Sequence, residues 1–194
     1  MSAIDKATVL DHDPDTIDLL KRFNFRIYYG DATRLDLLHA AGAEHAQLLI
    51  VAIDDPDTSL RLVDAVREHF PKLPLVARAR NVSHWSALRQ RGIEIVERET
   101  FEGAITLGRQ ALQTLGIGPY EARERADAFR RHNIRSLEDV LPHWHDEERR
   151  TSMARSAREQ LERQMDRDRS ELDRRGAPGW QTDVEIEGAD AERA

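Results

Sequence analysis

Short apolar runs alternate with amphipathic segments along the first 118 residues of the chain. The runs are rich in Val, Ile, Leu and Tyr, which is typical of strands. In the segments between them, apolar residues recur at every third or fourth position, which predicts helices. The expected strands are residues 7–10, 26–29, 47–53, 73–77 and 93–96. The expected helices are residues 15–23, 34–41, 56–69, 82–91 and 101–115.

This regular alternation predicts an α/β fold. Connections of only a few residues favour a parallel sheet with helices on both faces. Residues 48–53 are apolar at every position, as expected of a strand that is buried on both faces. Ligands of such sheets gather beyond the carboxyl ends of the strands. The residues that follow each expected strand are therefore the candidate site.

Polar side chains follow every expected strand. Some of the acids, such as Asp13 or Asp57, are equally candidates for capping the next helix. As a set, however, they group carboxylates and arginines at one edge of the sheet. In chain order the groups are Asp11-His12-Asp13, Gly30-Asp31-Ala32-Thr33, Asp54-Asp55, Arg78 with Arg80, and Glu97-Arg98-Glu99.

Two kinds of site place carboxylates at such an edge. In a nucleotide-binding sheet, the acid that ends a strand accepts hydrogen bonds from ribose hydroxyls. In a phosphoryl-receiver domain, acids from two strands hold Mg²⁺ beside a phosphorylatable aspartate, here Asp54. A receiver also requires a lysine at the end of a later strand, and no lysine follows a late strand here. The nucleotide alternative lacks the G-x-G-x-x-G turn, and only six residues precede the first expected strand.

The composition excludes several functional classes. The chain contains no cysteine, so it has no disulfide, no cysteine-bound metal and no cysteine nucleophile. Its net charge of −7 argues against nonspecific nucleic-acid binding. The longest apolar run is too short to span a membrane, so we expect a soluble, cytoplasmic chain. Residues 143–146 (His-Trp-His-Asp) form a weak metal-binding candidate without a second cluster, and we assign no metal site.

The character of the chain changes after residue 118. Residues 119–141 are expected to form a helical arm whose narrow apolar stripe suits packing on another surface. Residues 142–194 are expected to form a charged helix and then a disordered tail, because Leu161, Met165 and Leu172 are too sparse to build a core.

Several longer strings are specific enough to carry a resemblance to a known family. They resemble the nucleotide-binding regulatory (RCK/KTN) domain of potassium channels and transporters. In particular, they are similar to the cytosolic C-terminal domain of the Kef glutathione-gated potassium efflux systems. The strings are residues 9–15 (VLDHDPD), 29–33 (YGDAT), 52–56 (AIDDP), 77–80 (ARAR), 97–104 (ERETFEGA) and 118–127 (GPYEARERAD).

The resemblance implies a Rossmann-like, doubly wound parallel sheet that lacks its first strand and its glycine loop, followed by the helical extension and the charged, partly disordered tail. It also implies a membrane antiporter domain in the same protein, a homodimer at the cytoplasmic face of the bacterial inner membrane, and an ancillary flavoprotein subunit. The expected domains are a partial nucleotide-binding domain, a dimerisation and ligand arm, and the tail. They span residues 1–118, 119–141 and 142–194.

The resemblance also carries roles onto individual residues. Asp11 would be the acid that binds the ribose, Asp31, Ala32 and Thr33 would line the adenine pocket, and Asp54 would lie at the edge of the nucleotide. The cofactor would be NAD(H) or AMP, and its binding would be weak or lost without the glycine loop.

Three further residues, Phe23, Arg98 and Asn133, fall where the family binds glutathione between two subunits. An arginine suits a glutathione carboxylate because its guanidinium binds it in a bidentate manner. The asparagine suits the peptide backbone, and the phenylalanine suits the bulky group of a conjugate. Without the resemblance, each has an ordinary interpretation: a core residue at a helix end, a surface partner of Glu102, and a helix C-cap.

These observations predict a regulatory module rather than an enzyme. Glutathione would stabilise a state in which potassium efflux is closed, and bulkier conjugates would favour an open state, which requires different affinities for the two states. Two alternatives remain open. One is a nucleotide-dependent oxidoreductase, for which the chain lacks a glycine loop and a catalytic tyrosine–lysine pair, and the other is a receiver-like phosphorylation switch.

Overall fold

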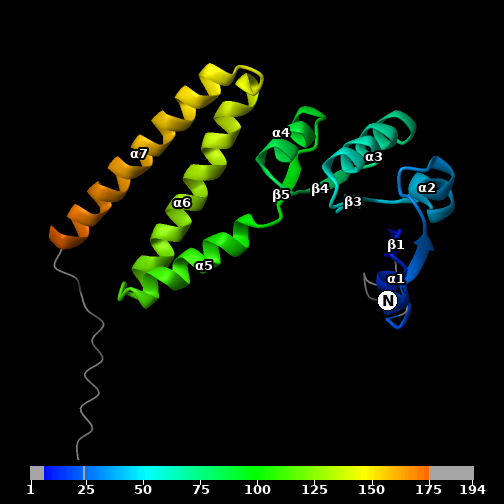
Figure 1. Cartoon of the computed structure of the whole chain (residues 1–194), viewed down its shortest axis with the longest axis horizontal. Coiled ribbons are helices and arrows are strands. Elements are labelled where there is room, and N and C mark those ends of the chain that lie inside the picture. The colour runs from blue at the N-terminus through cyan, green and yellow to red at the C-terminus, as the bar shows by residue number, and fades with distance from the viewer. Residues whose placement is uncertain (1–6, 24, 175–194) are drawn as a thin grey trace, which may run out of the picture. The chain divides into compact units, whose positions relative to one another are not determined.

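A computed structural model describes residues 7–23 and 25–174 of the chain (Figure 1). The chain divides into two compact units, here called the first unit, Met1–Ala122, and the second unit, Arg123–Ala194. The first unit holds the α/β part and the second unit is helical. The predicted disordered end of the tail lies outside the described residues.

Five parallel strands form two separate ladders in the first unit. The first ladder pairs β1 with β2, in the register Val9 opposite Ile27. The second ladder has the order β3-β4-β5, with Ile50 opposite Val76 and Val76 opposite Ile95. The strands are β1 Thr8–Asp11, β2 Arg26–Tyr29, β3 Leu49–Val51, β4 Leu75–Ala79 and β5 Ile95–Arg98. The predicted parallel α/β class is confirmed, but the strands form two ladders, β1-β2 and β3-β4-β5, rather than one continuous sheet.

The last two strands begin two residues later than the apolar pattern predicts. Leu73 and Ile93 are buried, but they are buried before the strands begin. Leu73 donates its N–H to the carbonyl of Phe70, and Ile93 donates to the carbonyl of Leu88, so both close the helix that precedes them. As a result, Arg78 and Arg98 lie within strands rather than after them.

Side-chain caps explain where three helices of the first unit begin, namely α1, α3 and α4. The carboxylate of Asp13 accepts hydrogen bonds from the N–H groups of Asp15 and Thr16 at the start of α1. Asp55 caps α3, and Asn81 caps α4 through the N–H of His84. Pro14 and Pro56 occupy the first helical positions of α1 and α3, where the fixed φ angle of proline already suits a helix. The helices are α1 Pro14–Lys21, α2 Leu35–Ala41, α3 Pro56–His69, α4 Val82–Gln90 and α5 Phe101–Thr114.

Helices α3 and α4 cover one face of the three-stranded ladder. Val51 and Ala77 point into the core with Val63, Val66 and Leu88, all of them essentially buried. The opposite face carries a row of apolar residues from the three strands: Ile50 lies opposite Val76, and Val76 lies opposite Ile95. Ile50 is 65% exposed and Ile95 is 58% exposed. This apolar face, here called the row face, is thus left open within the described chain.

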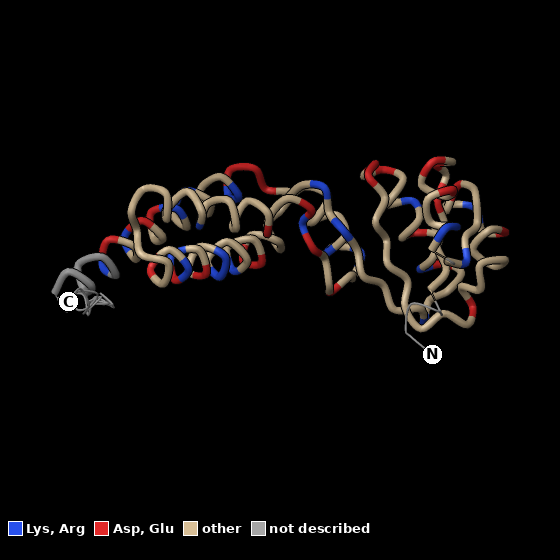
Figure 2. Tube along the Cα trace, turned by 90° about the horizontal axis from the view of Figure 1, so that it is seen from below, with Lys and Arg blue, Asp and Glu red and all other residues tan. Residues whose placement is uncertain are grey.

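The second unit is built from two long helices joined by a short 3-10 turn. Helix α6, Pro119–Val140, begins four residues before the second unit and spans nearly all of the helical arm expected over residues 119–141. Helix α7, Glu147–Arg174, follows the turn at Leu141–His143. Basic and acidic positions alternate along both helices (Figure 2).

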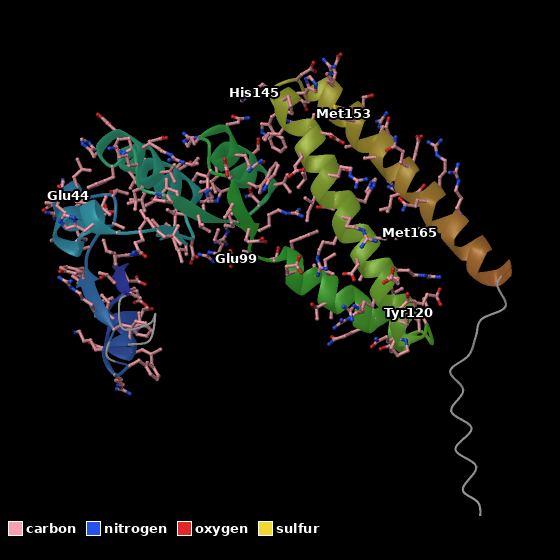
Figure 3. The ribbon with its side chains drawn as sticks, turned by 180° about the vertical axis from the view of Figure 1, so that it is seen from behind. Glu44, Glu99, Tyr120, His145, Met153 and Met165 are labelled. Carbon is pink, nitrogen blue, oxygen red and sulfur yellow. The ribbon has the colours of Figure 1, made fainter. Side chains whose placement is uncertain are left out.

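The apolar residues of α7 form a stripe despite their low number. Met153, Ala157, Leu161 and Met165 recur every four residues and are all partly buried. Figure 3 labels the first and the last of them on α7. Residues spaced by four lie on one side of a helix, so few of them suffice for a narrow contact. No helix in the described ranges is both long enough and apolar enough to cross a membrane.

Candidate functional site

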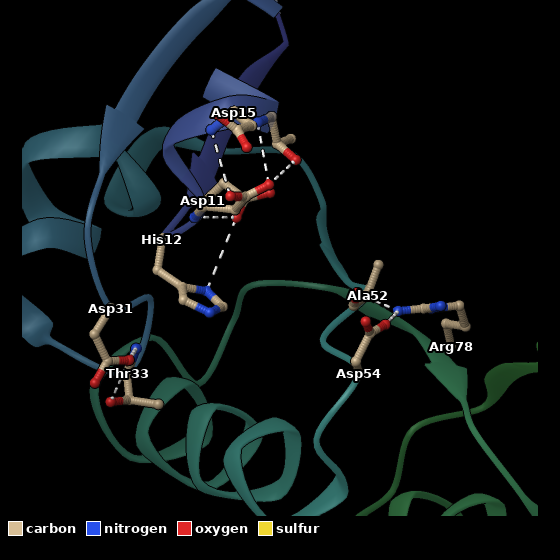
Figure 4. A network of polar contacts seen from close by, with 10 residues as sticks. Asp11, His12, Asp15, Asp31, Thr33, Ala52, Asp54 and Arg78 are labelled. Carbon is tan, nitrogen blue, oxygen red and sulfur yellow. Dashed lines mark hydrogen bonds and ion pairs between the residues drawn. The ribbon is translucent and has the colours of Figure 1, made fainter. Parts of the chain in front are cut away.

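A backbone hydrogen bond joins the carboxyl ends of the parallel strands β1 and β2. The N–H of Gly30 donates to the carbonyl oxygen of Asp11, with an N–O distance of 2.9 Å. The Asp11 carboxylate accepts the N–H of Asp13 at 2.9 Å, and the Nδ1 atom of His12 lies 3.9 Å from it (Figure 4). Asp11 is therefore held at the edge of the first ladder, whereas Asp13 caps the N-terminus of α1.

Asp31 is a second acid at this edge, and hydrogen bonds from Thr33 hold its carboxylate in place. The Oδ1 atom of Asp31 accepts both the N–H and the hydroxyl of Thr33, at 2.9 and 2.8 Å. These two bonds, the backbone one first, lower the pKa of Asp31. Gly30, directly before it, has φ 147°, and a Cβ there would meet the side chain of Leu37 at 3.0 Å. The glycine is thus required for this turn.

Electrostatic interactions connect this edge with helix α3. Arg61 of α3 lowers the pKa of Asp31 and also that of Asp55, although the hydrogen bonds from the neighbouring threonines dominate both shifts. His12 acts on Asp31 in the same direction. Arg61 was not a candidate in the sequence, because one arginine on an exposed helix face gives no signal without the fold.

Arg78 joins the carboxyl ends of the three strands in the second ladder. From β4, its Nη2 atom donates to the carbonyl oxygen of Ala52 at 2.6 Å and to the carboxylate of Asp54 (Figure 4). Its Nη1 atom lies 3.2 Å from the Glu99 carboxylate, just after β5. The hydrogen bond from the guanidinium lowers the pKa of Asp54. Asp54 is thus an ionised acid that is paired with an arginine.

His84 is a buried polar group that the sequence did not single out. The side chain is 3% exposed, and its Nδ1 atom accepts the N–H of Arg80 at 3.2 Å. The Nε2 atom is buried and has no hydrogen-bond partner among the residues of the described ranges. Burial lowers the pKa of His84, so the imidazole is neutral at physiological pH.

Metal binding gains no support from the described residues, where no three His, Asp or Glu side chains gather closely enough to hold an ion. The receiver alternative needs Asp11, Asp13 and Asp54 around Mg²⁺. In the structure, Asp13 caps α1 and Asp54 is paired with Arg78. Both carboxylates are already engaged in structural roles.

The three glutathione candidates come from separate elements. Phe23 follows α1 and is 65% exposed, so the alternative that it is a core residue is wrong. Arg98, in β5, is partly buried, and its guanidinium lies 3.7 Å from the centroid of the Phe101 ring. Burial lowers the pKa of Arg98. Asn133 lies in the second unit within α6, which continues to Val140, so it is not a C-cap.

Parallel ladders with acids held at their carboxyl edge define the class of Rossmann-like domains. A family model for the TrkA-N domain matches residues 2–98, and one for the potassium efflux system KefB C-terminal domain matches residues 103–179. The KefC proteins of Escherichia coli O157:H7 and Shigella boydii serotype 18 are each 51% identical to this chain over 176 residues, 91% of its length. The chain spans 28% of their length.

A solved structure gives the same assignment. The Kef C-terminal domain of Shewanella denitrificans, in an AMP-bound form, is 41% identical and superposes with a TM-score of 0.65. The match covers 71% of this chain and 83% of that domain. The chain therefore belongs to the family of Kef C-terminal domains, with a TrkA-N domain as its N-terminal half. It is homologous to the regulatory C-terminal domain of the glutathione-regulated potassium-efflux protein KefC.

Proposed function

We propose that this chain is the cytoplasmic regulatory module of a glutathione-gated potassium efflux system, and that it binds ligands without turning them over. The observation that carries the proposal is the match to an AMP-bound Kef domain, over most of that domain, combined with the acids at the edge of the ladders. The potassium/proton antiporter would belong to the part of the relatives that the chain does not span. Its working place would be the inner membrane.

The nucleotide site that we propose uses the edge of the first ladder. Asp11 would accept hydrogen bonds from the ribose hydroxyls, because an ionised carboxylate at a strand end is a strong acceptor for two vicinal donors. The turn at Asp31, Ala32 and Thr33 would lie against the adenine. Asp54 would bound the site from the second ladder. AMP is favoured over NAD(H) because the Kef domain of Shewanella denitrificans, which this chain resembles, is in an AMP-bound form.

The glutathione site that we propose uses Phe23, Arg98 and Asn133. Arg98 suits a carboxylate because its guanidinium stacks on Phe101, which fixes the plane of its N–H donors, and because partial burial strengthens a charged hydrogen bond. Phe23 is an exposed aromatic ring that suits the apolar substituent of a conjugate. Asn133 would donate to and accept from the peptide groups.

Two apolar surfaces support a homodimer. One is the row face on the three-stranded ladder. The other is formed by Leu107 of α5, which is 67% exposed, and by Leu115, the residue directly after α5, which is 79% exposed. A parallel sheet is normally covered on both faces, so an open face suits an apolar helix from a second copy. An ancillary flavoprotein subunit remains part of the proposal through the family resemblance.

Calorimetric titration of the 194-residue chain tests the proposed function. We expect AMP and glutathione to bind without any product appearing after prolonged incubation. In Asp11→Asn, AMP binding should weaken by about tenfold, since a charge-assisted hydrogen bond is replaced by a neutral one. The matched control, Asp15→Asn, changes an exposed acid in the first turn of α1 and should leave the affinity unchanged. Hydride transfer to a substrate, or labelling of Asp54 by acetyl phosphate, would contradict the proposal.

A further inference from the structure

His84 is a titratable side chain that is buried where strand β4 passes into helix α4. It lies in the first turn of α4 and is 3% exposed. Its Nδ1 atom accepts the N–H of Arg80 at 3.2 Å, and its backbone N–H donates to the Asn81 side chain at 2.8 Å. His84 therefore bonds to both residues of the β4–α4 connection.

These bonds fix the protonation state of the imidazole ring. A ring nitrogen that accepts a backbone N–H carries no proton, so the proton of the neutral ring lies on Nε2. The Nε2 atom is buried and finds no acceptor within the part of the chain that the structure describes. A second proton, on Nδ1, would point at the N–H of Arg80 and would place a charge in a buried position. The protonated ring therefore does not fit the observed conformation.

Charged groups from the neighbouring elements also act on the ring. Burial and then the charge of Arg78 in β4 lower the pKa of His84. Asp55 and Asp57, at the start of α3, act in the opposite direction. Helix α4 also packs on β5, but the charged residues of that strand do not act on the ring. The net shift is downward, so the ring gains its proton only below its ordinary pKa of 6.5.

Two arginines connect this part of the fold with the candidate nucleotide site. Arg78 of β4 donates to the carbonyl oxygen of Ala52 and to the carboxylate of Asp54. The hydrogen bond from Arg78 and, to a smaller extent, the charge of Arg80 lower the pKa of Asp54. Loss of the bond between Arg80 and His84 would free the backbone that joins these two arginines to α4. It would thereby weaken their contact with Asp54.

We infer that His84 is a pH-sensitive switch at the β4–α4 connection. The neutral ring holds Arg80 and Asn81 in the observed conformation. The protonated ring releases them, because Nδ1 then has no lone pair with which to accept the N–H of Arg80. Release loosens the edge of the sheet at Asp54 and lowers the affinity for AMP. This last step rests on the proposed function, whereas the switch itself rests on the geometry of His84.

An NMR titration of the 194-residue chain from about pH 7.5 to about pH 5 tests the switch without a ligand. The ring nitrogens report the protonation of His84, and amide hydrogen exchange reports the bond from the N–H of Arg80. After correction for the intrinsic exchange rate, we expect exchange at Arg80 to accelerate by about tenfold, with the same midpoint as the ring. The amide of Gly92, which bonds to Arg89 at the other end of α4, is the internal control and should keep its protection.

His84→Asn is the matched variant, because the asparagine Oδ1 atom can accept the N–H of Arg80 at every pH. In calorimetric titrations between about pH 7.5 and about pH 5, the AMP affinity of the parent chain should fall about threefold more than that of the variant. The phosphate of AMP, which titrates near about pH 6, and the exposed His12 affect both chains equally. By reciprocity, saturating AMP should lower the pKa of His84 in the parent chain.

Exchange at Arg80 that does not follow the ring, or a ring that stays neutral until the chain unfolds, would overturn the switch. Equal pH dependence of AMP affinity in the parent chain and in His84→Asn, or a pKa of His84 that AMP raises, would overturn its effect on the site. If Arg80 follows the ring but AMP does not bind at either pH, the switch stands and the proposed nucleotide function fails.

Discussion

At the scale of single residues, local side-chain bonds place the acids of the site, and long-range bonds tie them together. The bonds of Asp31 to Thr33 and of Asp13 to α1 span two or three residues, and such motifs are visible in the sequence. The contacts of Arg78 with Ala52 and Asp54 span 26 and 24 residues. Only the parallel pairing of β3 with β4 creates them, so the sequence indicates Arg78 at the edge of the sheet but not its partners. Arg61 and His84 were not candidates in the sequence.

Arg78→Gln should destabilise the second ladder. The change removes the hydrogen bonds of the guanidinium to the Ala52 carbonyl and to Asp54, and its ion pair with Glu99. We expect the free energy of unfolding to fall by about 1–2 kcal/mol, a modest loss because the ion pair of Arg78 with Asp54 is partly exposed to solvent. Urea denaturation measures this value. Arg80→Gln, an exposed arginine after the same strand, is the control and should change stability by less than about 0.5 kcal/mol.

His84→Asn should change how stability depends on pH. The asparagine Oδ1 atom can replace Nδ1 as the acceptor for Arg80, but it does not titrate. The folded state holds the pKa of His84 below its ordinary value of 6.5, so the unfolded chain binds more protons as the pH falls below that value. The parent chain should therefore lose stability from pH 6.5 downwards, and the variant should lose less, by at most about 1.4 kcal/mol per pH unit.

Denaturation curves at about pH 7.5 and 5.5 measure this difference, above the range in which carboxylates titrate. His45→Asn, at an exposed position, is the control and should behave like the parent chain. Equal pH dependence in His84→Asn and the parent chain would show that burial of this imidazole does not oppose its protonation.

At the scale of elements, the sequence predicts the order and type of every strand and helix of the first unit, because period-2 and period-3.6 patterns are strong there. It misplaces the starts of β4 and β5, since Leu73 and Ile93 are apolar for packing at helix ends. It treats the apolar residues of α7 as too sparse for packing, although Met153 and Leu161 are partly buried. In a helix of mostly charged residues, composition alone does not reveal a narrow stripe of apolar residues spaced by four.

Asp55→Ala should shorten or loosen α3 at its N-terminus. The Asp55 carboxylate accepts the N–H and the hydroxyl of Thr58, and loss of such a cap costs about 1 kcal/mol of stability. Thermal unfolding followed by circular dichroism measures the effect. Asp57→Ala, in the first turn of the same helix, is the control. An equal loss in both variants would assign the effect to charge near the helix dipole rather than to capping.

At the scale of the whole molecule, the chain consists of an α/β unit whose sheet is divided and a helical unit that is rich in charge. The sequence predicts the class of fold and, through the family strings, the identity of the module. It does not predict that the three-stranded ladder leaves one face open. A run such as Leu-Ile-Val indicates that both faces of the strand are covered, but not whether this chain or another chain covers them. The open face is the main physical argument for self-association.

Leu107→Asn combined with Leu115→Asn should weaken the homodimer. Both side chains are exposed apolar groups, one on α5 and one directly after it, and their burial against a second copy would contribute about 1.5–3 kcal/mol each. Sedimentation equilibrium should show a shift of the double variant towards monomer, by at least tenfold in the dissociation constant. Leu19→Asn, an exposed leucine on α1, should leave the equilibrium unchanged. A parent chain that is monomeric at all concentrations would contradict the proposal of a dimer.

The most direct test of the central claim, that this chain is a binding module for two different ligands, is NMR chemical-shift mapping on the full chain with AMP and glutathione in separate titrations. We expect AMP to move the amide signals of Asp11, Asp31, Thr33 and Asp54. We expect glutathione to move those of Phe23, Arg98 and Asn133, and neither ligand to be chemically altered. Unchanged spectra at millimolar ligand, or shifts confined to residues outside these two sets, would contradict it.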